Sequence, residues 1–187
     1  AEDLKPNRLE AAKDVAAEFI NGRPNDNIGI TLFAGETFTQ CPLTVDHAVL
    51  LDMIHNIKCG LITDGTAVGM GIANAVTRLK DSKAKSKVII LLTDGTNNKG
   101  DISPMTAAEI AKSFGIRVYT IGVGTNGMAP YPYPVGNTVQ YVSMPVEIDE
   151  KTLTEIAGTT DGNYFRATSN SKLKEVYEEI DKLEKTK

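Results

Sequence analysis

Two short segments of this chain carry oxygen-bearing side chains beside a glycine. Thr93-Asp94-Gly95 follows a run of apolar residues, and Asp64-Gly65-Thr66 precedes a predicted helix. Hydroxyl and carboxylate oxygens are hard ligands that suit Mg²⁺, which takes about six oxygens in near-octahedral order and keeps some of them as water. If the two segments lie at one edge of the fold, the sequence predicts part of a magnesium site, with Thr66 and Asp94 as its ligands.

Each segment also has a simpler structural explanation. A threonine directly before a helix, such as Thr66, can act as an N-cap that contributes about 1 kcal/mol. Asp94-Gly95 is a common turn pair. Taken singly, residues of these kinds are more often structural, so the metal interpretation depends on both segments reaching the same edge of a sheet.

The element that must position Asp94 is the strand before it. Val88 to Leu92 are consecutive and apolar, a pattern typical of a strand that is covered on both faces of a parallel sheet. In open α/β sheets, ligands bind at the carboxyl edge of the strands. The sequence therefore places Asp94 at the edge where a ligand is expected.

The rest of the chain alternates helical and strand patterns. Helices are predicted over residues 7–22, 44–58, 67–81, 103–114, 149–158 and 171–185, and strands over 27–33, 37–41, 88–92, 116–123 and 163–167, with a short strand within 138–148. Residues 125–137, rich in glycine and proline, predict an irregular loop. This order predicts a doubly wound α/β domain with a mostly parallel, Rossmann-like sheet and one antiparallel edge strand. A strand should precede the first helix in this pattern, so we expect the sequence to start one strand late.

The composition is that of an ordinary globular domain, with 41% hydrophobic and 24% charged residues in a chain of 187. The net charge of −4 gives no general electrostatic support for nucleic-acid binding. No apolar run approaches the roughly 20 residues that a membrane helix needs. Cys41 and Cys59 flank a predicted helix about 20 Å long, which is too far for a disulfide bond, so we expect two free thiols.

Three other patterns lack a feature that their chemistry needs. In haloacid-dehalogenase phosphatases, the nucleophile is an aspartate two residues before the aspartate of an Asp-Gly-Thr segment. Here Leu92 and Ile62 occupy that position. Residues 121–127 match the bare spacing of a dinucleotide loop, yet the prolines that follow prevent the helix that must bind the pyrophosphate. His47 and His55 lie too far apart on one helix to share a metal, and they support no Ser-His-Asp triad. The sequence therefore predicts a protein that is not an enzyme, and a phosphatase-like activity is the weakest alternative.

Together these features resemble the von Willebrand factor A (VWA) domain, and the resemblance covers nearly the whole chain. The family's threonine loop matches Asp64-Gly65-Thr66 with Ala67-Val68-Gly69, and its aspartate after the central strand matches Asp94. The third part of the family's metal-ion-dependent adhesion site (MIDAS), an Asp-x-Ser-x-Ser loop after the first strand, occurs nowhere in the 187 residues. The resemblance implies a single VWA-like domain over residues 1–187 that lacks its first strand and its serine loop.

The same resemblance assigns roles to the two candidate ligands. Thr66 would coordinate the metal directly, Asp94 would do so directly or through water, and an Asp or Glu of a partner protein would complete the shell. The absent serines would supply two further ligands, so Mg²⁺ is expected to bind this chain weakly or not at all. Equal and tight binding by this chain and by one extended upstream would contradict that expectation.

A narrower resemblance points to the bacterial Bat-type (aerotolerance, BatA-like) membrane-anchored VWA proteins. It rests on the segments LKPNRLEAAK, FAGETFTQCPLT, GLITDGTAVG, PVEIDEKTL and YFRAT. In that family the domain is tethered to the inner membrane by flanking transmembrane helices and is associated with MoxR-type ATPases. The resemblance implies a soluble domain of the bacterial cell envelope, with other Bat-type proteins or a MoxR-type ATPase as partners.

The alternative function is a VWA scaffold that needs no metal and binds partners through side surfaces or through residues 129–136. This segment reads APYPYPVG, in which Tyr131 and Tyr133 would be rigid amphipathic anchors and the prolines would lower the cost of ordering. A tolerated surface insertion is the simpler explanation of the same segment.

Overall fold

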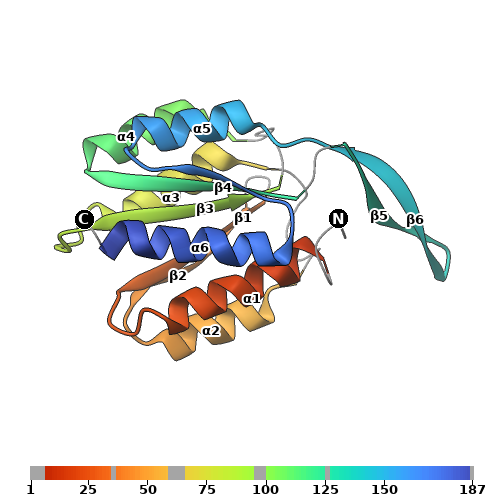
Figure 1. The fold of residues 1–187 in the computed structure, drawn as a ribbon, viewed down its shortest axis with the longest axis horizontal. Helices are drawn as coiled ribbons and strands as arrows, with labels where there is room; N and C mark the ends of the chain where they lie inside the picture. Colours follow the sequence, from red (N-terminus) through yellow and green to blue (C-terminus); the bar gives the residue numbers. More distant parts are fainter. Residues whose placement is uncertain (1–6, 35–36, 59–65, 95–99, 125–126, 186–187) are drawn as a thin grey trace.

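The chain folds into a layered α/β structure in which helices cover both faces of a sheet (Figure 1). The computed structural model describes residues 7–34, 37–58, 66–94, 100–124 and 127–185. The strands are β1 (Ile28–Ala34), β2 (Thr37–Thr44), β3 (Lys87–Thr93), β4 (Ile116–Val123), β5 (Gly127–Val135), β6 (Thr138–Val146) and β7 (Tyr164–Ala167). The helices are α1 (Arg8–Asn21), α2 (His47–Asn56), α3 (Val68–Leu79), α4 (Pro104–Ser113), α5 (Glu150–Thr159) and α6 (Asn170–Lys185).

Strands β3, β4 and β7 form a parallel sheet in that order, with β4 in the middle. The predicted strand at residues 88–92 is therefore confirmed as β3, but β4 is the more deeply buried of the two. Every residue of β4 except Arg117 is buried, whereas buried and partly buried residues alternate along the second half of β3. Both strands end at the same edge, because parallel strands share their direction.

Two apolar layers enclose this sheet. On one face, Ile89 and Leu91 of β3 pack with α3, α4 and α5. On the other face, Val88, Ile90 and Leu92 pack with α1 and α6. This division follows from the strand itself, since successive side chains point to opposite faces. The uninterrupted apolar run of β3 thus supplies both layers, as its pattern predicted.

Strands β1 and β2 form a separate antiparallel pair. They share a third apolar cluster with α1 and α2, in which Leu50 is fully buried. Within the described residues, β1 and β3 belong to different hydrogen-bonded ladders. The antiparallel edge pair is as predicted, and the expectation of a further strand before α1 stays a prediction.

Side chains cap two helices at their predicted starts. The Asn7 side chain accepts a hydrogen bond from the Glu10 amide at 2.9 Å, and the Ser103 hydroxyl accepts one from the Thr106 amide at 3.1 Å. Each satisfies a helix N–H that has no partner within the helix. One boundary was wrong: Thr44 ends β2 instead of opening α2, and its hydroxyl accepts from the Asp46 amide at 3.0 Å.

The largest difference from the sequence prediction lies at residues 125–137, which were expected to form an irregular loop. Residues 127–135 instead form β5, which pairs with β6 in an antiparallel hairpin that projects from the body (Figure 1). Gly136 at the hairpin turn has φ +59°, which glycine adopts without strain. The proline-rich pattern was misleading because prolines are compatible with a strand whose edge is unpaired.

Candidate metal-binding edge of the sheet

Asp94 lies at the carboxyl edge of the parallel sheet, directly after β3. Its side chain is 56% exposed, while Thr93 before it is buried. The strand thus holds the backbone of this position firmly and leaves the carboxylate accessible. This is the placement that the sequence predicted for Asp94.

Thr66 precedes α3 by two positions and is half-buried. The N-cap position of α3 is Ala67, which has no side-chain oxygen, so the simpler reading of Thr66 as an N-cap is wrong. Asp64, Gly65 and Gly95 lie outside the described residues. The role of Thr66 as a metal ligand stays a prediction.

The start of α3 lies against residues 100–102. A Cβ on Gly69 would be 2.0 Å from the carbonyl oxygen of Ile102, and one on Gly100 would be 3.3 Å from the Cβ of Ala67. Only glycines allow the backbones to approach this closely. The structure therefore packs residues 100–102, which follow Asp94 in the chain, against the start of the helix that Thr66 precedes.

Arg8 is a member of this edge that the sequence prediction missed. Its side chain is 6% exposed, and its Nη1 lies 3.4 Å from both Oδ2 and the carbonyl oxygen of Asp94. A signal was present in the sequence: Arg8 shares one face of α1 with the buried Ala11 and Val15, so its side chain had to turn toward the sheet.

Gly124, directly after β4, provides the space for this arginine. Its φ of +111° is one that side chains rarely adopt, and a Cβ there would lie 2.3 Å from the Cζ of Arg8. The Gly124 carbonyl also accepts a hydrogen bond from Arg166 Nε at 2.9 Å. Two guanidinium groups thus converge on one glycine, and each of them also contacts a carboxylate, Arg8 that of Asp94 and Arg166 that of Glu150.

Glu150 balances the second arginine. Its carboxylate accepts hydrogen bonds from the Tyr164 hydroxyl and from Arg166 Nη1, both at 2.8 Å. These bonds stabilise the charged form and lower the pKa of Glu150. Burial, together with the bond to Glu150, raises the pKa of Tyr164 to about 12, so the tyrosine stays a neutral donor.

The donor set for a metal is small. Among the described residues, no group of three or more His, Cys, Asp or Glu side chains could hold a metal ion. Cys41 is a buried free thiol and Cys59 lies outside the described residues. His47 contacts the Asp26 carbonyl at 2.7 Å through Nε2, which makes it part of the α2 packing. The oxygens of Thr66 and Asp94 fit a hard cation but fall short of the number that Mg²⁺ takes.

The dinucleotide pattern at residues 121–127 has no functional counterpart. The segment ends β4 and begins β5, so a strand follows where a pyrophosphate-binding helix would be required.

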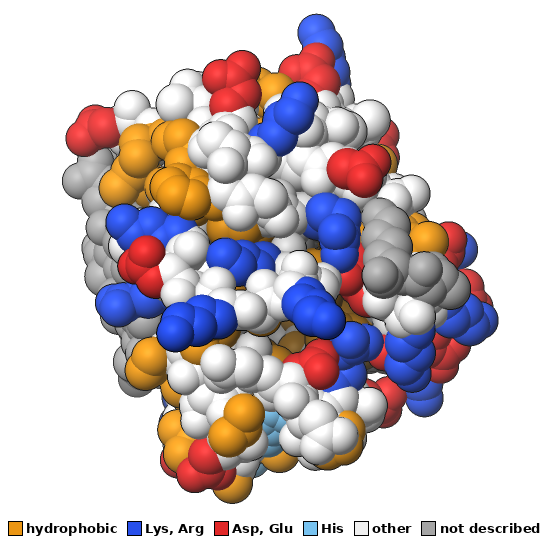
Figure 2. All heavy atoms as spheres, turned by 90° about the vertical axis from the view of Figure 1, so that its left-hand side faces the viewer, with side chains coloured by type: hydrophobic (Ala, Val, Ile, Leu, Met, Phe, Trp, Pro, Cys, Tyr) orange, Lys and Arg blue, Asp and Glu red, His pale blue; other side chains and the backbone are white. Residues whose placement is uncertain are grey.

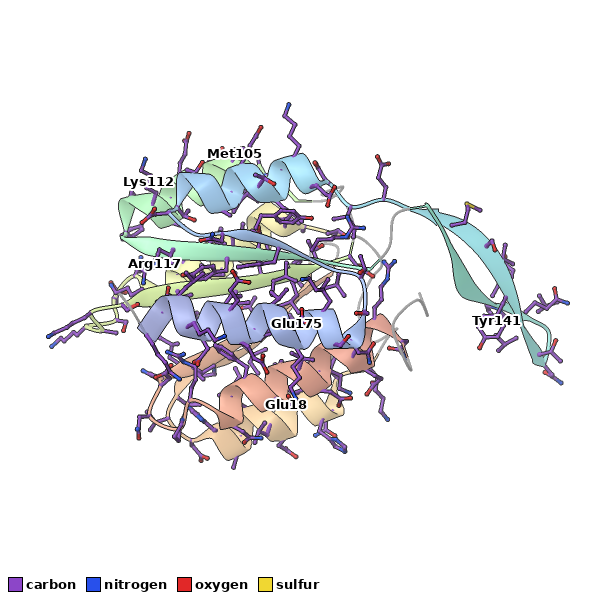
Figure 3. The ribbon with its side chains drawn as sticks, viewed as in Figure 1. Glu18, Met105, Lys112, Arg117, Tyr141 and Glu175 are labelled. Carbon is purple, nitrogen blue, oxygen red and sulfur yellow. The ribbon has the colours of Figure 1, made fainter. Side chains whose placement is uncertain are left out.

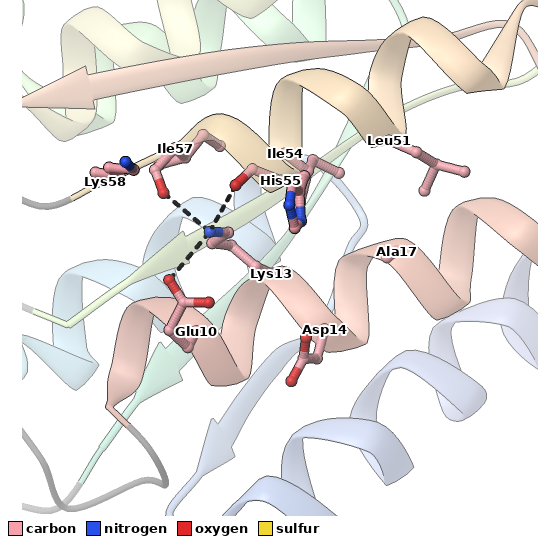
Figure 4. A pocket seen from close by; sticks show the side chains of 9 residues that line it. All are labelled: Glu10, Lys13, Asp14, Ala17, Leu51, Ile54, His55, Ile57 and Lys58. Atoms are coloured by element: carbon pink, nitrogen blue, oxygen red, sulfur yellow. Dashed lines mark hydrogen bonds and ion pairs between the residues drawn. The ribbon is translucent and has the colours of Figure 1, made fainter.

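A cavity of about 370 Å³ lies between α1 and α2 (Figure 4). Lys13 Nζ crosses it and donates to Glu10 at 3.0 Å and to the carbonyls of His55 and Ile57 at 3.3 and 2.9 Å. A lysine in this position supplies donors to the carbonyls that end α2. The arrangement stabilises a helix end, and we assign it no ligand.

The opposite edge of the sheet, where β3 and β4 begin, is rich in basic residues. Figure 2 shows Lys and Arg side chains across the middle of this face, and Figure 3 labels Lys112 and Arg117 there. Arg117 pairs with Glu184 at 2.7 Å. Lys83 and Lys85 are exposed, which is the usual state of lysines on a solvated surface.

The model of the von Willebrand factor type A domain family matches residues 2–179 of the chain. The crystal structure of an aerotolerance-related membrane protein from Bacteroides fragilis is 28% identical, with a TM-score of 0.82 over 97% of this chain and 90% of that chain. The structure of BatB from Bacteroides thetaiotaomicron is 31% identical, with a TM-score of 0.82 over 99% and 92%.

More distant neighbours and sequence relatives agree with these matches. Proximal thread matrix protein 1 of the mussel byssus, solved with zinc in its MIDAS motif, is 25% identical with a TM-score of 0.71 and covers 95% of this chain and 41% of that one. A UPF0353 protein of Nocardia farcinica is 31% identical over 97% of this chain and 58% of the relative. An uncharacterized protein of Borreliella burgdorferi is 28% identical over 95% and 52%. The chain spans little more than half the length of these relatives. No helix within the described residues has both the length and the apolar character to cross a membrane.

Proposed function

Because this chain belongs to the von Willebrand factor type A family, we propose that it is a non-enzymatic protein-interaction module with a Mg²⁺-dependent docking site at the carboxyl edge of its sheet. The observation that supports this most directly is the placement of Asp94. Its carboxylate is 56% exposed at the end of a strand whose inward-facing residues are buried. An exposed carboxylate on a rigid element is suited to present a cation to a partner.

The residues at that edge would have two roles, to bind the ion and to attract an acidic partner. Thr66 and Asp94 would hold the ion through two hard oxygens, and bound Mg²⁺ would supply a positive centre with room for one carboxylate from a partner. Arg8 would contribute a positive charge beside the ion, which favours the approach of an Asp or Glu side chain. The upstream serine loop that the family uses would supply the remaining ligands.

Similarity to BatB and to the aerotolerance-related membrane protein supports a narrower proposal about location and partners. We propose that the domain acts at the bacterial cell envelope as part of a membrane-associated assembly. Other Bat-type proteins or a MoxR-type ATPase are the partners to test first, and the partner surface should offer an Asp or Glu.

The test is calorimetric titration of Mg²⁺ into this chain and into a chain extended upstream through an Asp-x-Ser-x-Ser strand. We expect measurable binding in the extended chain and weak or no binding in the 187-residue chain. In the extended chain, Thr66→Val and Asp94→Asn should each weaken binding by about tenfold or more, because each removes one ligand.

Asp101→Asn is the matched control, since Asp101 is an exposed acid in the segment that follows Asp94. It should leave Mg²⁺ affinity unchanged. Equally tight Mg²⁺ binding by the 187-residue chain and the extended chain would show that the serine loop is not needed. Unchanged Mg²⁺ affinity in the Thr66→Val and Asp94→Asn variants would show that the ion does not bind at this edge.

A further inference from the structure

The β5–β6 hairpin has an unusual composition for a projecting element. No Asp, Glu, Lys or Arg occurs from Gly127 to Val146, although 24% of the chain is charged. Large apolar side chains are exposed along it: Met128, Tyr133, Val135, Val139, Tyr141 and Val142. Figure 3 shows Tyr141 on the hairpin, away from the helices of the body. Exposed apolar surface of this extent marks an interaction site.

The outer edge of β5 cannot accept another strand. In an antiparallel pair, alternate residues point their N–H and C=O toward the partner strand, and the residues between them point these groups outward. Pro130, Pro132 and Pro134 occupy alternate positions of β5, opposite Ser143, Tyr141 and Val139. Because proline has no N–H, these are the outward-pointing positions, and the outer edge of β5 has no donor at any of them. We call this the closed edge.

The outer edge of β6 differs. The residues opposite the prolines, namely Val139, Tyr141 and Ser143, belong to the same outward-pointing set. Each of them has a backbone N–H. Within the described residues, β5 is the only strand paired with β6. Lysine, proline and charge are the usual means of protecting an edge strand, and all are absent from residues 138–144. We call this the open edge.

We propose that the open edge of β6 pairs with the open edge of β6 in a second copy of this chain. In an antiparallel arrangement about a twofold axis, Tyr141 lies opposite Tyr141 of the second copy, and Val139 lies opposite Ser143 of the second copy. The pairing ends at Pro145, which has no N–H to donate. The product is a four-stranded sheet, β5-β6-β6-β5, with a closed edge on each side.

Three features favour a second copy over an unrelated partner strand. The same edge is presented by both copies, as a twofold interface requires. The absence of charge means that identical side chains can meet without like-charge repulsion. The closed edges also stop the assembly at two copies, whereas an open β5 would continue it into a filament.

The hairpin geometry agrees with this arrangement. The hairpin extends away from the body (Figure 1), and the register centred on Tyr141 places the turn of each hairpin near Pro145 of the other. The two bodies then lie at opposite ends of the shared sheet, which keeps two domains of net charge −4 apart. The interface is small, so we expect the dimer to be weak and in exchange with the monomer.

Sedimentation equilibrium of the chain over about 1 µM to 2 mM tests the proposal. The wild-type chain should pass from monomer to dimer and no further. The double variant Val139→Pro with Ser143→Pro should stay monomeric, because it closes the β6 edge in the way that β5 is already closed. Both prolines would occupy outward-pointing positions, so the hairpin, the far-UV circular dichroism and the thermal midpoint should be unchanged.

The converse variant, Pro132→Val with Pro134→Val, restores donors to the closed edge and should give species larger than a dimer. As a side-chain control, Val139→Lys should weaken dimerisation at least tenfold, while Tyr133→Lys, at an equally exposed position on β5, should not; both side chains are 59% exposed. A wild-type chain that stays monomeric at the highest concentration would overturn the proposal, as would a dimer that survives Val139→Pro with Ser143→Pro.

Discussion

Replacing Gly124 by alanine probes the contact that organises the candidate edge. Gly124 has φ +111°, and a Cβ there would lie 2.3 Å from the Cζ of Arg8. The substitution therefore imposes two separate costs. One is the backbone conformation, which alanine rarely adopts. The other is the displacement of a side chain that is only 6% exposed.

Both costs can be bounded from the structure. A non-glycine residue in a sparsely populated backbone region costs about 1–3 kcal/mol. Moving the Arg8 guanidinium away from Asp94 and from its buried position costs about 1 kcal/mol more, the value of one such contact. We expect Gly124→Ala to lower the free energy of unfolding by about 2–4 kcal/mol, which corresponds to a fall of very roughly 5–15 °C in the thermal midpoint of a domain this size.

Urea unfolding of Gly124→Ala, Arg8→Ala and the double variant separates the two costs. If the contact matters, Gly124→Ala should cost about 1 kcal/mol less in the Arg8→Ala background than in the wild type. Gly158→Ala in α5 is the control, because a Cβ there meets nothing within 4 Å, and it should be neutral or stabilising by up to about 1 kcal/mol. Additive effects of Arg8→Ala and Gly124→Ala would refute the contact, and a total cost below about 0.5 kcal/mol would refute both parts of the reasoning.

Two further substitutions test how the body is held together. Glu184 is 7% exposed and accepts hydrogen bonds from Arg117 and Tyr119. Burial alone would raise the pKa of Glu184, but these hydrogen bonds outweigh burial and lower the pKa below the usual 4.5. Ionised Glu184 therefore stabilises the fold above about pH 4.5, and this contribution is lost as the pH falls through the lowered pKa. Because Glu184→Gln has no carboxylate to protonate, its free energy of unfolding in urea should fall less than that of the wild type between about pH 6 and pH 3. An identical pH profile for both proteins would contradict this. Ser103→Ala should cost about 1 kcal/mol by loss of the α4 cap, measured by the same unfolding assay, whereas a change below about 0.3 kcal/mol would show that Pro104 alone sets that helix start.

The parts of the fold that the sequence predicted correctly are those fixed by local patterns. The apolar run Val88–Leu92 became β3 because a run of this kind can only be covered from both sides. The helices predicted to start at residues 7, 103 and 149 begin there because the side-chain oxygens of Asn7, Ser103 and Asp149 each accept a hydrogen bond from an amide three residues later. In these cases the partners are a few residues apart, so the sequence contains the whole interaction.

The parts that it did not predict depend on partners far apart in the chain. Arg8 contacts Asp94, which lies 86 positions away in the sequence, and no residue near Arg8 indicates that partner. The hairpin was misread for a related reason. The glycine and proline content of residues 125–137 predicts a loop, whereas the spacing of the prolines matches the outward positions of an edge strand once β6 is known to lie alongside. A period of two in the prolines was the available signal.

Arg8 and a metal ion would use the same carboxylate, and the geometry indicates that the arginine does not exclude the ion. The 3.4 Å separation between Arg8 Nη1 and Asp94 Oδ2 exceeds the roughly 2.7–2.9 Å of a strong charge-assisted bond. With Asp94 56% exposed, such a pair contributes about 1 kcal/mol or less. A divalent ion in direct contact attracts the carboxylate more strongly than a single charge at longer range. Arg8, held against Gly124, cannot follow the carboxylate and would remain beside the ion as a second positive charge. This edge would therefore accept an acidic side chain from a partner and disfavour a basic one.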